Sequence, residues 1–314
     1  MRAVTFDDGA VVIADRDDLT PGPGEVLVGT RAAGLNGADM LQRRGRYPAP
    51  AGAVADIPGL EFAGEVLAVG GGVQRFAAGD RVMGITGGGG QASQVVEHER
   101  ILMPIPDELT WAQAGGFPEV AITAHDALCT QAGLRPGERV LVTGAAGGVG
   151  TAAVQIAAAL GAHVVASVRN VAAHDAVREL GAHEVVAPDA VADHGPYDVV
   201  LELVGAVNLD TNLRNLATGG RIVVIGIGAG AKAEINLALL LGTRGRILGS
   251  TLRARPLEQK ALTARAVERE VLPWVAAGRL TVPVDATFDV EDAAAAYDHF
   301  TAGGKLGKVV LTFG

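Results

Sequence analysis

The chain has 314 residues, of which 49% are hydrophobic, and this length is sufficient for two domains with cores of their own. Its net charge of −9, with no basic block, argues against a nucleic-acid surface, and no apolar run approaches the ~20 residues that span a bilayer. A single cysteine, Cys129, excludes disulfides within the chain, and seven histidines without paired ligand spacing predict no metal site.

The first hundred residues alternate β-like stretches with glycine-rich turns, which predicts a barrel-like region built mainly of strands. The N-terminus carries acids where a signal peptide would carry an apolar core, so we expect a cytoplasmic protein. The stretches expected to form strands are 10–14, 25–30, 62–69, 81–85 and 92–96.

From about Thr110 the pattern becomes helical, over 112–129, and then strands alternate with helices up to about residue 252. This alternation predicts a parallel, doubly wound sheet. The later strands expected in it are 199–203, 221–225 and 246–252.

The remaining sequence predicts one long helix over 256–277, followed by pieces at 281–290, 293–300 and 308–313. We therefore expect a discontinuous plan, with a substrate domain made of residues 1–117 and 254–314. Residues 118–253 would form the cofactor domain.

A glycine turn lies between the apolar run 140–143 and the Ala-rich stretch 151–160. Glycines at GxxGxxG spacing in a strand–turn–helix–strand context allow a tight turn and bring backbone N–H groups close to a pyrophosphate at the helix N-terminus. A chance match in a chain with 44 glycines is the alternative, and the flanking elements disfavour it. The residues expected to bind the dinucleotide here are Gly144, Ala146, Gly147, Gly148, Val149 and Gly150.

The second strand, 163–168, ends without the acid that accepts hydrogen bonds from the ribose 2′-OH in an NAD site. Arg169 instead offers a charge-assisted contact to a 2′-phosphate, and Ser167 and Asn170 add neutral donors. We therefore predict NADPH as the cofactor. The alternative is that Arg169 is an ordinary solvated loop residue.

Several segments together resemble the zinc-independent quinone oxidoreductases of the medium-chain dehydrogenase/reductase superfamily. They occur in family order over almost the whole chain, at 33–39, 44–48, 57–64, 79–82, 144–150 and 307–311. Within that family, segments 39–43, 102–106 and 117–120 look most like the tumour-suppressor-inducible branch, which uses NADPH to reduce quinones. The resemblance implies a Rossmann-type sheet with a discontinuous, β-rich GroES-like barrel domain, and a homodimer joined through the edge strand 246–252.

The zinc-dependent alcohol dehydrogenases of that superfamily carry a Cys and a His-Glu pair where this chain has Asn36 and Leu60-Glu61. Leucine cannot bind zinc, so alcohol oxidation, which needs a Lewis acid to polarise the hydroxyl group or a general base to take its proton, is disfavoured. A quinone carbonyl is already electrophilic, so binding, orientation and a proton from a donor or water suffice.

The resemblance places Tyr47 near the nicotinamide, as a proton donor or as a residue that only packs over the cofactor. Asn36 is the other catalytic candidate, as a hydrogen-bond partner of a carbonyl or carboxamide, with a structural turn role as the alternative. We expect Asp39 to hold that loop through backbone N–H groups. Glu61 is expected to be structural, held by hydrogen bonds or an ion pair.

Three further residues are expected to contact the cofactor. Gly226 and Ile227 follow a predicted strand, at the carboxyl end where crevice loops meet the nicotinamide. Lys308 matches a family position near the cofactor, although a solvated strand residue fits its sequence context equally well.

We therefore predict an NADPH-dependent enzyme that transfers a hydride from nicotinamide C4 to a quinone. Reduction of α,β-unsaturated carbonyls or enoyl thioesters is the second hypothesis, because the same cleft can deliver hydride to any conjugated acceptor. A sensor or crystallin-like protein that binds NADPH with little turnover is the third. The variable loops 47–56 and 87–90 would shape the acceptor pocket.

Overall fold

The computed structural model describes residues 1–314, which divide into two compact units. Unit 1 comprises Met1–Ile122 and Leu252–Gly314, and unit 2 comprises Thr123–Thr251. These limits lie two to five residues from the domain limits expected at 117 and 254. The helix α3 (Pro118–His125) begins within unit 1, because the backbone N–H of Glu119 donates to Glu61 Oε2 at 2.9 Å. No helix has the length and apolarity needed to cross a membrane.

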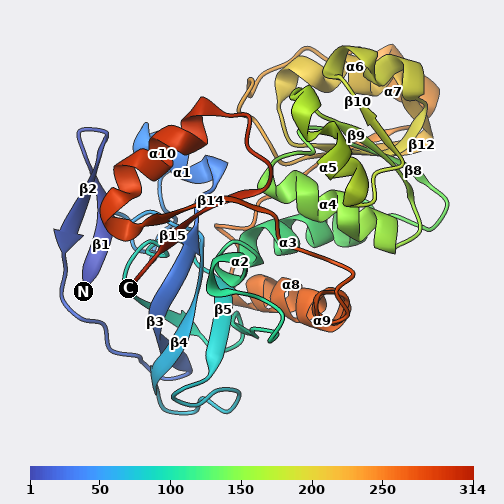
Figure 1. The fold of residues 1–314 in the computed structure, drawn as a ribbon. Helices are drawn as coiled ribbons and strands as arrows, with labels where there is room; N and C mark the ends of the chain where they lie inside the picture. The colour runs from blue at the N-terminus through green and yellow to red at the C-terminus, as the bar shows by residue number, and fades with distance from the viewer. The chain divides into compact units, whose positions relative to one another are not determined.

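Unit 2 contains a six-stranded parallel sheet with the strand order β10-β9-β8-β11-β12-β13, and α4 lies on the opposite face from α6 and α7 (Figure 1). This order is that of a dinucleotide-binding Rossmann sheet, in which the order of successive strands reverses between β8 and β11. The strands are β8 (Arg139–Val142), β9 (His163–Ser167), β10 (Glu184–Val186), β11 (Tyr197–Glu202), β12 (Leu216–Val224) and β13 (Arg246–Gly249). The helices are α4 (Gly148–Ala159), α5 (His174–Glu179), α6 (Leu209–Arg214) and α7 (Leu237–Thr243).

The central strands of unit 2 are short and apolar because helices cover both faces of the sheet. Val140, Leu141 and Val142 are fully buried, as are Val199, Val200 and Leu201 on the neighbouring strand. Helix α4 is buried along most of its length, and its alanines allow it to pack closely on β8 and β9. The rigid core therefore positions the loops at the carboxyl ends of β8 and β11.

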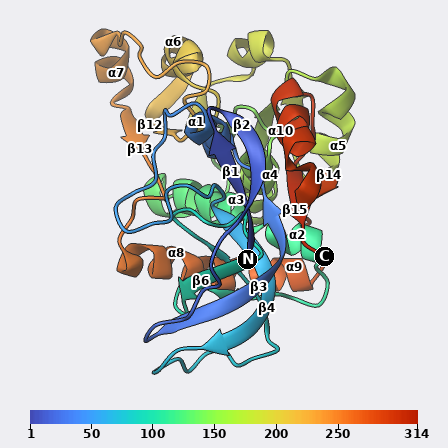
Figure 2. The same cartoon turned by 90° about the vertical axis from the view of Figure 1, so that its left-hand side faces the viewer.

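Unit 1 is built on a seven-stranded sheet in the order β14-β15-β3-β4-β5-β7, with β6 also pairing with β3 (Figures 1 and 2). The long strand β3 alternates buried and partly exposed side chains up to Thr30, as expected for a strand with one face on a core. The strands are β3 (Glu25–Gly34), β4 (Glu61–Val69), β5 (Arg81–Ile85), β6 (Gln94–His98), β7 (Met103–Pro104), β14 (Val284–Asp289) and β15 (Lys308–Thr312). A separate hairpin is formed by β1 (Arg2–Asp7) and β2 (Ala10–Asp15).

Five helices complete unit 1 beside α3. Tyr297 of α10 is fully buried in a cluster with Leu35 and Leu311, which fixes this helix against β15. Helix α8 buries Ala261, Ala264 and Val267, one apolar stripe at helical spacing. The helices are α1 (Gly37–Arg43), α2 (Trp111–Gly115), α8 (Leu257–Glu270), α9 (Leu272–Ala276) and α10 (Ala293–Ala302).

The structure corrects several sequence-based expectations. The long helix expected over 256–277 is two helices that meet near Val271, because Pro273 has no N–H for a continuous helix. The edge strand expected over 246–252 ends at Gly249, and Leu252 is buried in unit 1. Helix α1 and strand β1 are not among the elements that the sequence predicts.

Candidate active site

The glycine turn after β8 adopts the conformation that its sequence predicts. Gly144 has a φ of +59°, which favours glycine, and Gly147 is the N-cap of α4. A Cβ on Gly150 would lie 2.5 Å from the carbonyl oxygen of Gly144, so only glycine allows the helix to pack this closely on the turn. The first backbone N–H groups of α4 have no partners within the helix, and this end of the helix carries a partial positive charge.

The end of β9 lies beside this turn. The carbonyl of Ser167 accepts a hydrogen bond from the N–H of Ala145 at 3.1 Å, which joins the two segments. Arg169 and Asn170 follow directly and are exposed, and Asn170 Oδ1 accepts from the N–H of Ala172 at 3.1 Å. The structure thus brings Ser167 against the glycine turn and leaves the Arg169 side chain available to a ligand.

The loop after β12 packs on the end of β11. A Cβ on Gly226 would lie 1.9 Å from the carbonyl oxygen of Leu203, so this close approach requires glycine. A Cβ on Gly144 would lie 3.3 Å from the Val204 side chain, so the loops after β8 and β11 are neighbours. Ile227 follows Gly226 and is 48% exposed, at the crevice where the sequence predicts a cofactor contact.

Glu202 is a residue of this region that the sequence analysis missed. Its carboxylate is buried at the end of β11 and accepts hydrogen bonds from the backbone N–H groups of Val204 (2.7 Å) and Gly205 (2.8 Å). Thr143 and Asn212 also donate to it, at 3.1 and 2.7 Å. The only available signal was an acid at the end of an apolar strand. Glu202 fixes the loop that borders the glycine turn.

These features of unit 2 fit a dinucleotide. The Gly144–Gly150 segment leaves room for close backbone approach, the α4 N-terminus favours an anion, and the crevice lies where the strand order reverses. Whether each predicted contact residue touches the cofactor stays a prediction.

Unit 1 contains a buried polar cluster around Glu61. Lys308 Nζ lies 2.6 Å from Glu61 Oε1, 2.8 Å from Asn36 Oδ1 and 2.7 Å from the carbonyl oxygen of Leu35. Lys308 is 3% exposed and Glu61 is fully buried, so Lys308 is not a solvated strand residue. The ion pair that the sequence predicts for Glu61 is therefore present, with Lys308 as its partner.

Asn36 belongs to the same cluster. Its Nδ2 donates to Glu61 Oε1 at 2.9 Å and to the carbonyl oxygen of Gly34 at 3.3 Å. Both N–H groups of the amide are therefore engaged within unit 1. The catalytic role predicted for Asn36 stays a prediction, and it requires one of these bonds to open.

Asp39 holds the neighbouring loop as the sequence predicts. It accepts from the backbone N–H groups of Asn36 (2.8 Å) and Gly59 (3.2 Å) and from Gln91 Nε2 (3.3 Å). Burial raises the pKa of Asp39 to about 6, against the opposing effect of these N–H groups and of Lys308.

Glu119 adds a third carboxyl group, and burial together with the charge of Glu61 raises its pKa to about 8. Glu119 is therefore mostly protonated at neutral pH.

The donor set around Glu61 does not fit a zinc ion. Asn36 presents an amide, Leu60 has no donor atom, and the Lys308 ammonium group bonds directly to the carboxylate that a metal would need. Zinc sites are built from Cys, His and carboxylate ligands, and a cation at 2.6 Å opposes the binding of another. No three His, Cys, Asp or Glu side chains in the structure form a metal-binding group.

Tyr47 lies on the loop after α1, and Arg253 holds this loop. The guanidinium lies 5.0 Å from the centroid of the Tyr47 ring, and Nη1 donates to the Tyr47 carbonyl oxygen at 2.9 Å. Nη2 donates to Gln42 Oε1 at 2.7 Å. Arg253 could not be predicted from the sequence, because more than 200 residues separate it from its partners.

Comparison with known proteins identifies the class of enzyme to which these sites belong. Residues 22–130 match the alcohol dehydrogenase GroES-like domain, and residues 148–269 match the zinc-binding dehydrogenase family. The quinone oxidoreductase of Pseudomonas aeruginosa is 33% identical, with 95% of this chain and 94% of that protein covered. The chain belongs to the medium-chain dehydrogenase/reductase superfamily, with a GroES-like domain and a Rossmann-type sheet.

Other relatives and structures are more varied. The polyketide synthase GfsB of Streptomyces halstedii is 38% identical over 92% of this chain, but the chain spans only 5% of that protein. An NAD-dependent alcohol dehydrogenase structure is 30% identical with a TM-score of 0.87, and each chain is covered completely. A mycobacterial protein complexed with NADPH is 26% identical with a TM-score of 0.86, and 99% of each chain is covered.

Proposed function

We propose that this oxidoreductase uses NADPH to reduce a quinone and works without zinc, as the tumour-suppressor-inducible quinone oxidoreductases do. The observation that carries the proposal is the Glu61–Lys308–Asn36 cluster, which stands in place of metal ligands. An acceptor that needs no Lewis acid, such as a quinone, suits such a site. The quinone oxidoreductase of P. aeruginosa, matched over nearly its full length, supports the same acceptor class.

The proposal of NADPH over NADH rests on the end of β9. Arg169 is exposed next to the glycine turn, and the β9 end carries no acid to bind a ribose 2′-OH. The similar mycobacterial protein is complexed with NADPH, whereas another similar structure is NAD-dependent. The choice between the two cofactors is therefore tested by an Arg169 variant.

In this mechanism a bound nicotinamide supplies the hydride, and the residues of unit 1 orient the acceptor. Tyr47, held by Arg253, offers a phenol that hydrogen-bonds the acceptor oxygen. The Lys308 ammonium group compensates the negative charge of Glu61, and Asn36 donates a hydrogen bond to the same carboxylate. No unpaired negative charge at Glu61 therefore opposes an acceptor that gains electron density. Protonation of the reduced acceptor comes from Tyr47 or from water.

A second candidate is the reduction of enones or enoyl thioesters, and a specific observation favours it. The polyketide synthase GfsB is more similar in sequence than the quinone oxidoreductase, at 38% against 33% identity. Enone reduction also places hydride on a conjugated acceptor, but it needs a proton at the α-carbon.

Initial rates of NADPH oxidation with simple quinones, enones and enoyl thioesters separate these candidates. We expect the highest kcat/KM with a quinone. A higher kcat/KM with an enoyl thioester would establish the second candidate. Tight NADPH binding with negligible rates across the panel would instead identify a binding protein without turnover.

We also propose that the protein forms a homodimer through unit 2. The strand β13 is the last strand of its sheet, so one edge of its backbone has no neighbouring strand. Leu237 and Leu241 on the adjacent α7 are 65% and 77% exposed, which is unusual for leucines unless a partner covers them.

A further inference from the structure

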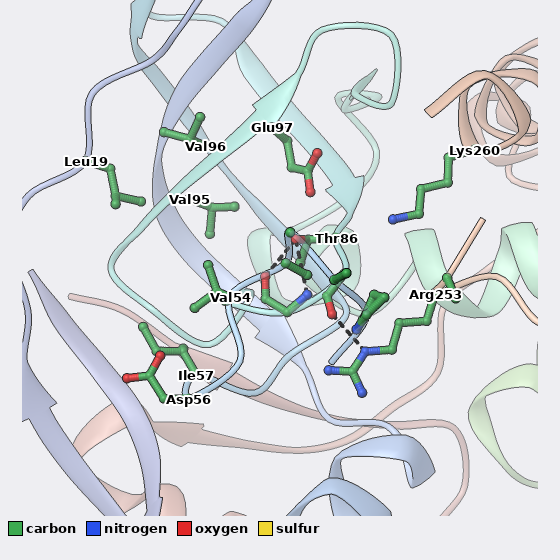
Figure 3. A pocket seen from close by; sticks show the side chains of 18 of the residues that line it. Leu19, Val54, Asp56, Ile57, Thr86, Val95, Val96, Glu97, Arg253 and Lys260 are labelled. Carbon is green, nitrogen blue, oxygen red and sulfur yellow. Dashed lines mark hydrogen bonds between the residues drawn. The ribbon is translucent and has the colours of Figure 1, made fainter. Parts of the chain in front are cut away.

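A cavity of about 770 Å³ lies within unit 1, and Figure 3 shows the side chains that line it. Its walls include the loop residues Ala53 and Val54 and the glycines 87–89, which belong to the two loops expected to shape the acceptor pocket. The volume is in the range of small-molecule sites. The cavity is therefore large enough to hold an acceptor of moderate size.

One side of this cavity is apolar. Leu19, Val54 and Ile57 contribute side chains there, and Val95 and Val96 of β6 lie beside them (Figure 3). An aromatic ring or a hydrocarbon chain would lose its hydration shell favourably against this wall.

The opposite side carries a buried cation. Arg253 is 3% exposed and forms no ion pair: Nε donates to the Gly87 carbonyl oxygen at 2.8 Å, and Nη1 and Nη2 donate to Tyr47 and Gln42. These three bonds use three of its five N–H groups, all three acceptors are neutral, and Asp39 and Glu119 act on Arg253 only as nearby charges. A buried charge that forms no ion pair is unfavourable, and a bound anion would relieve this.

A second cation lies on the same side. Lys260 of α8 is half-buried, and its Nζ lies 3.8 Å from the position that a Cβ on Gly87 would occupy. Figure 3 shows its side chain directed toward the space between Glu97 and Arg253. The same Cβ would also lie 2.8 Å from the Ala53 side chain, so glycine at position 87 keeps this corner open.

No acid of the cavity forms an ion pair with either of these two cations. Asp56 is paired with Arg16 at 2.9 Å, at the far side from Lys260 (Figure 3). Burial raises the pKa of Glu97, and Lys260 acts on Glu97 as a nearby positive charge that opposes this rise. Asp17 is the remaining acid of the lining.

We propose that this cavity binds ligands that combine an apolar body with a carboxylate, and that Lys260 and Arg253 bind the carboxylate. The consequence for catalysis, that acceptors bearing an acidic group are preferred, rests on the proposed reductase function. The binding of such ligands to the cavity does not rest on that function.

Binding of 2-naphthoate, which cannot accept a hydride under these conditions, tests the cavity without turnover. Calorimetry with wild type, Lys260→Gln and the matched control Lys232→Gln, an exposed lysine of unit 2, compares the Kd values. We expect Lys260→Gln to weaken 2-naphthoate about tenfold, since one charge-assisted contact is lost, and Lys232→Gln to leave the Kd unchanged. The neutral 2-naphthamide should show no such dependence on Lys260. Equal Kd values of 2-naphthoate for wild type and Lys260→Gln, or no binding to wild type, would overturn the proposal.

A kinetic comparison separates this inference from the proposed function. NADPH oxidation is followed with 1,4-naphthoquinone and with its 2-carboxylate, and we expect the carboxylate to have the lower KM in wild type and to lose that advantage in Lys260→Gln. Reduction of both quinones with equal KM, together with no 2-naphthoate binding, would refute carboxylate binding in the cavity and leave the proposed reductase function standing. Lys260-dependent binding of 2-naphthoate with no quinone reduced would support carboxylate binding and refute the proposed reductase function.

Discussion

Replacing Lys308 with methionine should destabilise unit 1 by about 3–5 kcal/mol, because it removes one partner of a buried ion pair. Lys308 Nζ contacts Glu61 at 2.6 Å, and Glu61 is fully buried. Without the ammonium group, the carboxylate keeps only the Asn36 amide and the Glu119 N–H as donors. The Leu35 carbonyl oxygen also loses its bond to Nζ. For a domain of this size the loss corresponds to a fall in Tm of roughly 5–20 °C.

The two tryptophans allow this change to be measured in unit 1 alone. Trp111 and Trp274 both belong to unit 1, so urea unfolding followed by tryptophan fluorescence reports its stability. Lys305→Met is the matched control, since Lys305 is a nearby, less buried lysine without an ion pair, which donates to the Phe300 carbonyl oxygen at 3.2 Å and lies 3.7 Å from the centroid of the Phe300 ring. We expect the control to lose about 1 kcal/mol or less.

A second variant tests the cause of the destabilisation. In Lys308→Met/Glu61→Gln the uncompensated charge is gone, so part of the stability lost in Lys308→Met should return. A loss below about 1 kcal/mol in Lys308→Met, or a double variant no more stable than the single one, would refute the reasoning.

Four further predictions concern the cofactor site, acid stability and assembly. Arg169→Ala should weaken NADPH far more than NADH in fluorescence titrations, and equal losses would show that the arginine does not select the cofactor. Gly150→Ala should abolish binding of both dinucleotides, since its Cβ would lie 2.5 Å from the Gly144 carbonyl oxygen; retained binding in the same titration would contradict this. Hydrogen bonds from His163, His194 and Arg139 lower the pKa of Glu184 to about 2, so it contributes stability above its unfolded pKa of about 4.5 that is lost as the pH falls toward 2. Glu184→Gln should therefore show a smaller fall in Tm over that range than wild type, and an identical fall would refute the assignment. Leu241→Glu should yield monomers in light scattering if α7 lies in a dimer interface, whereas an unchanged mass would exclude it.

The glycine turn of unit 2 and the elements on either side of it could be predicted because their signals are local. The strand β8, the glycine turn, α4 and β9 are consecutive in the chain, and each carries its own pattern of apolar residues or glycines. The turn conformation at Gly144 and the tight packing at Gly150 follow from that spacing.

The polar cluster and the Tyr47 loop of unit 1 could not be predicted in detail because their contacts join distant segments. Lys308 and Asn36 are 272 positions apart, and no local pattern pairs them. Arg253 is likewise 206 positions from Tyr47, so its role in holding that loop is visible only in the fold.

Short elements were missed for a different reason. Helix α1 has only seven residues and lies among strands, although Asp39 bonding back to the N–H of Asn36 is a recognisable helix start. Strand β1 pairs with β2 and makes only an isolated bridge to Ala92, and acids beside it obscured its apolar residues. The long helix expected over 256–277 is two helices because of a single residue, Pro273, whose missing N–H interrupts the helical hydrogen bonds.

The central claim is that the chain transfers a hydride from NADPH to a quinone without zinc. An anaerobic assay with 1,4-benzoquinone, in the presence of a strong zinc chelator, measures NADPH consumed and hydroquinone formed. We predict one hydroquinone for each NADPH and a rate that the chelator does not change. No NADPH oxidation, or a rate that the chelator abolishes and added zinc restores, would contradict the account.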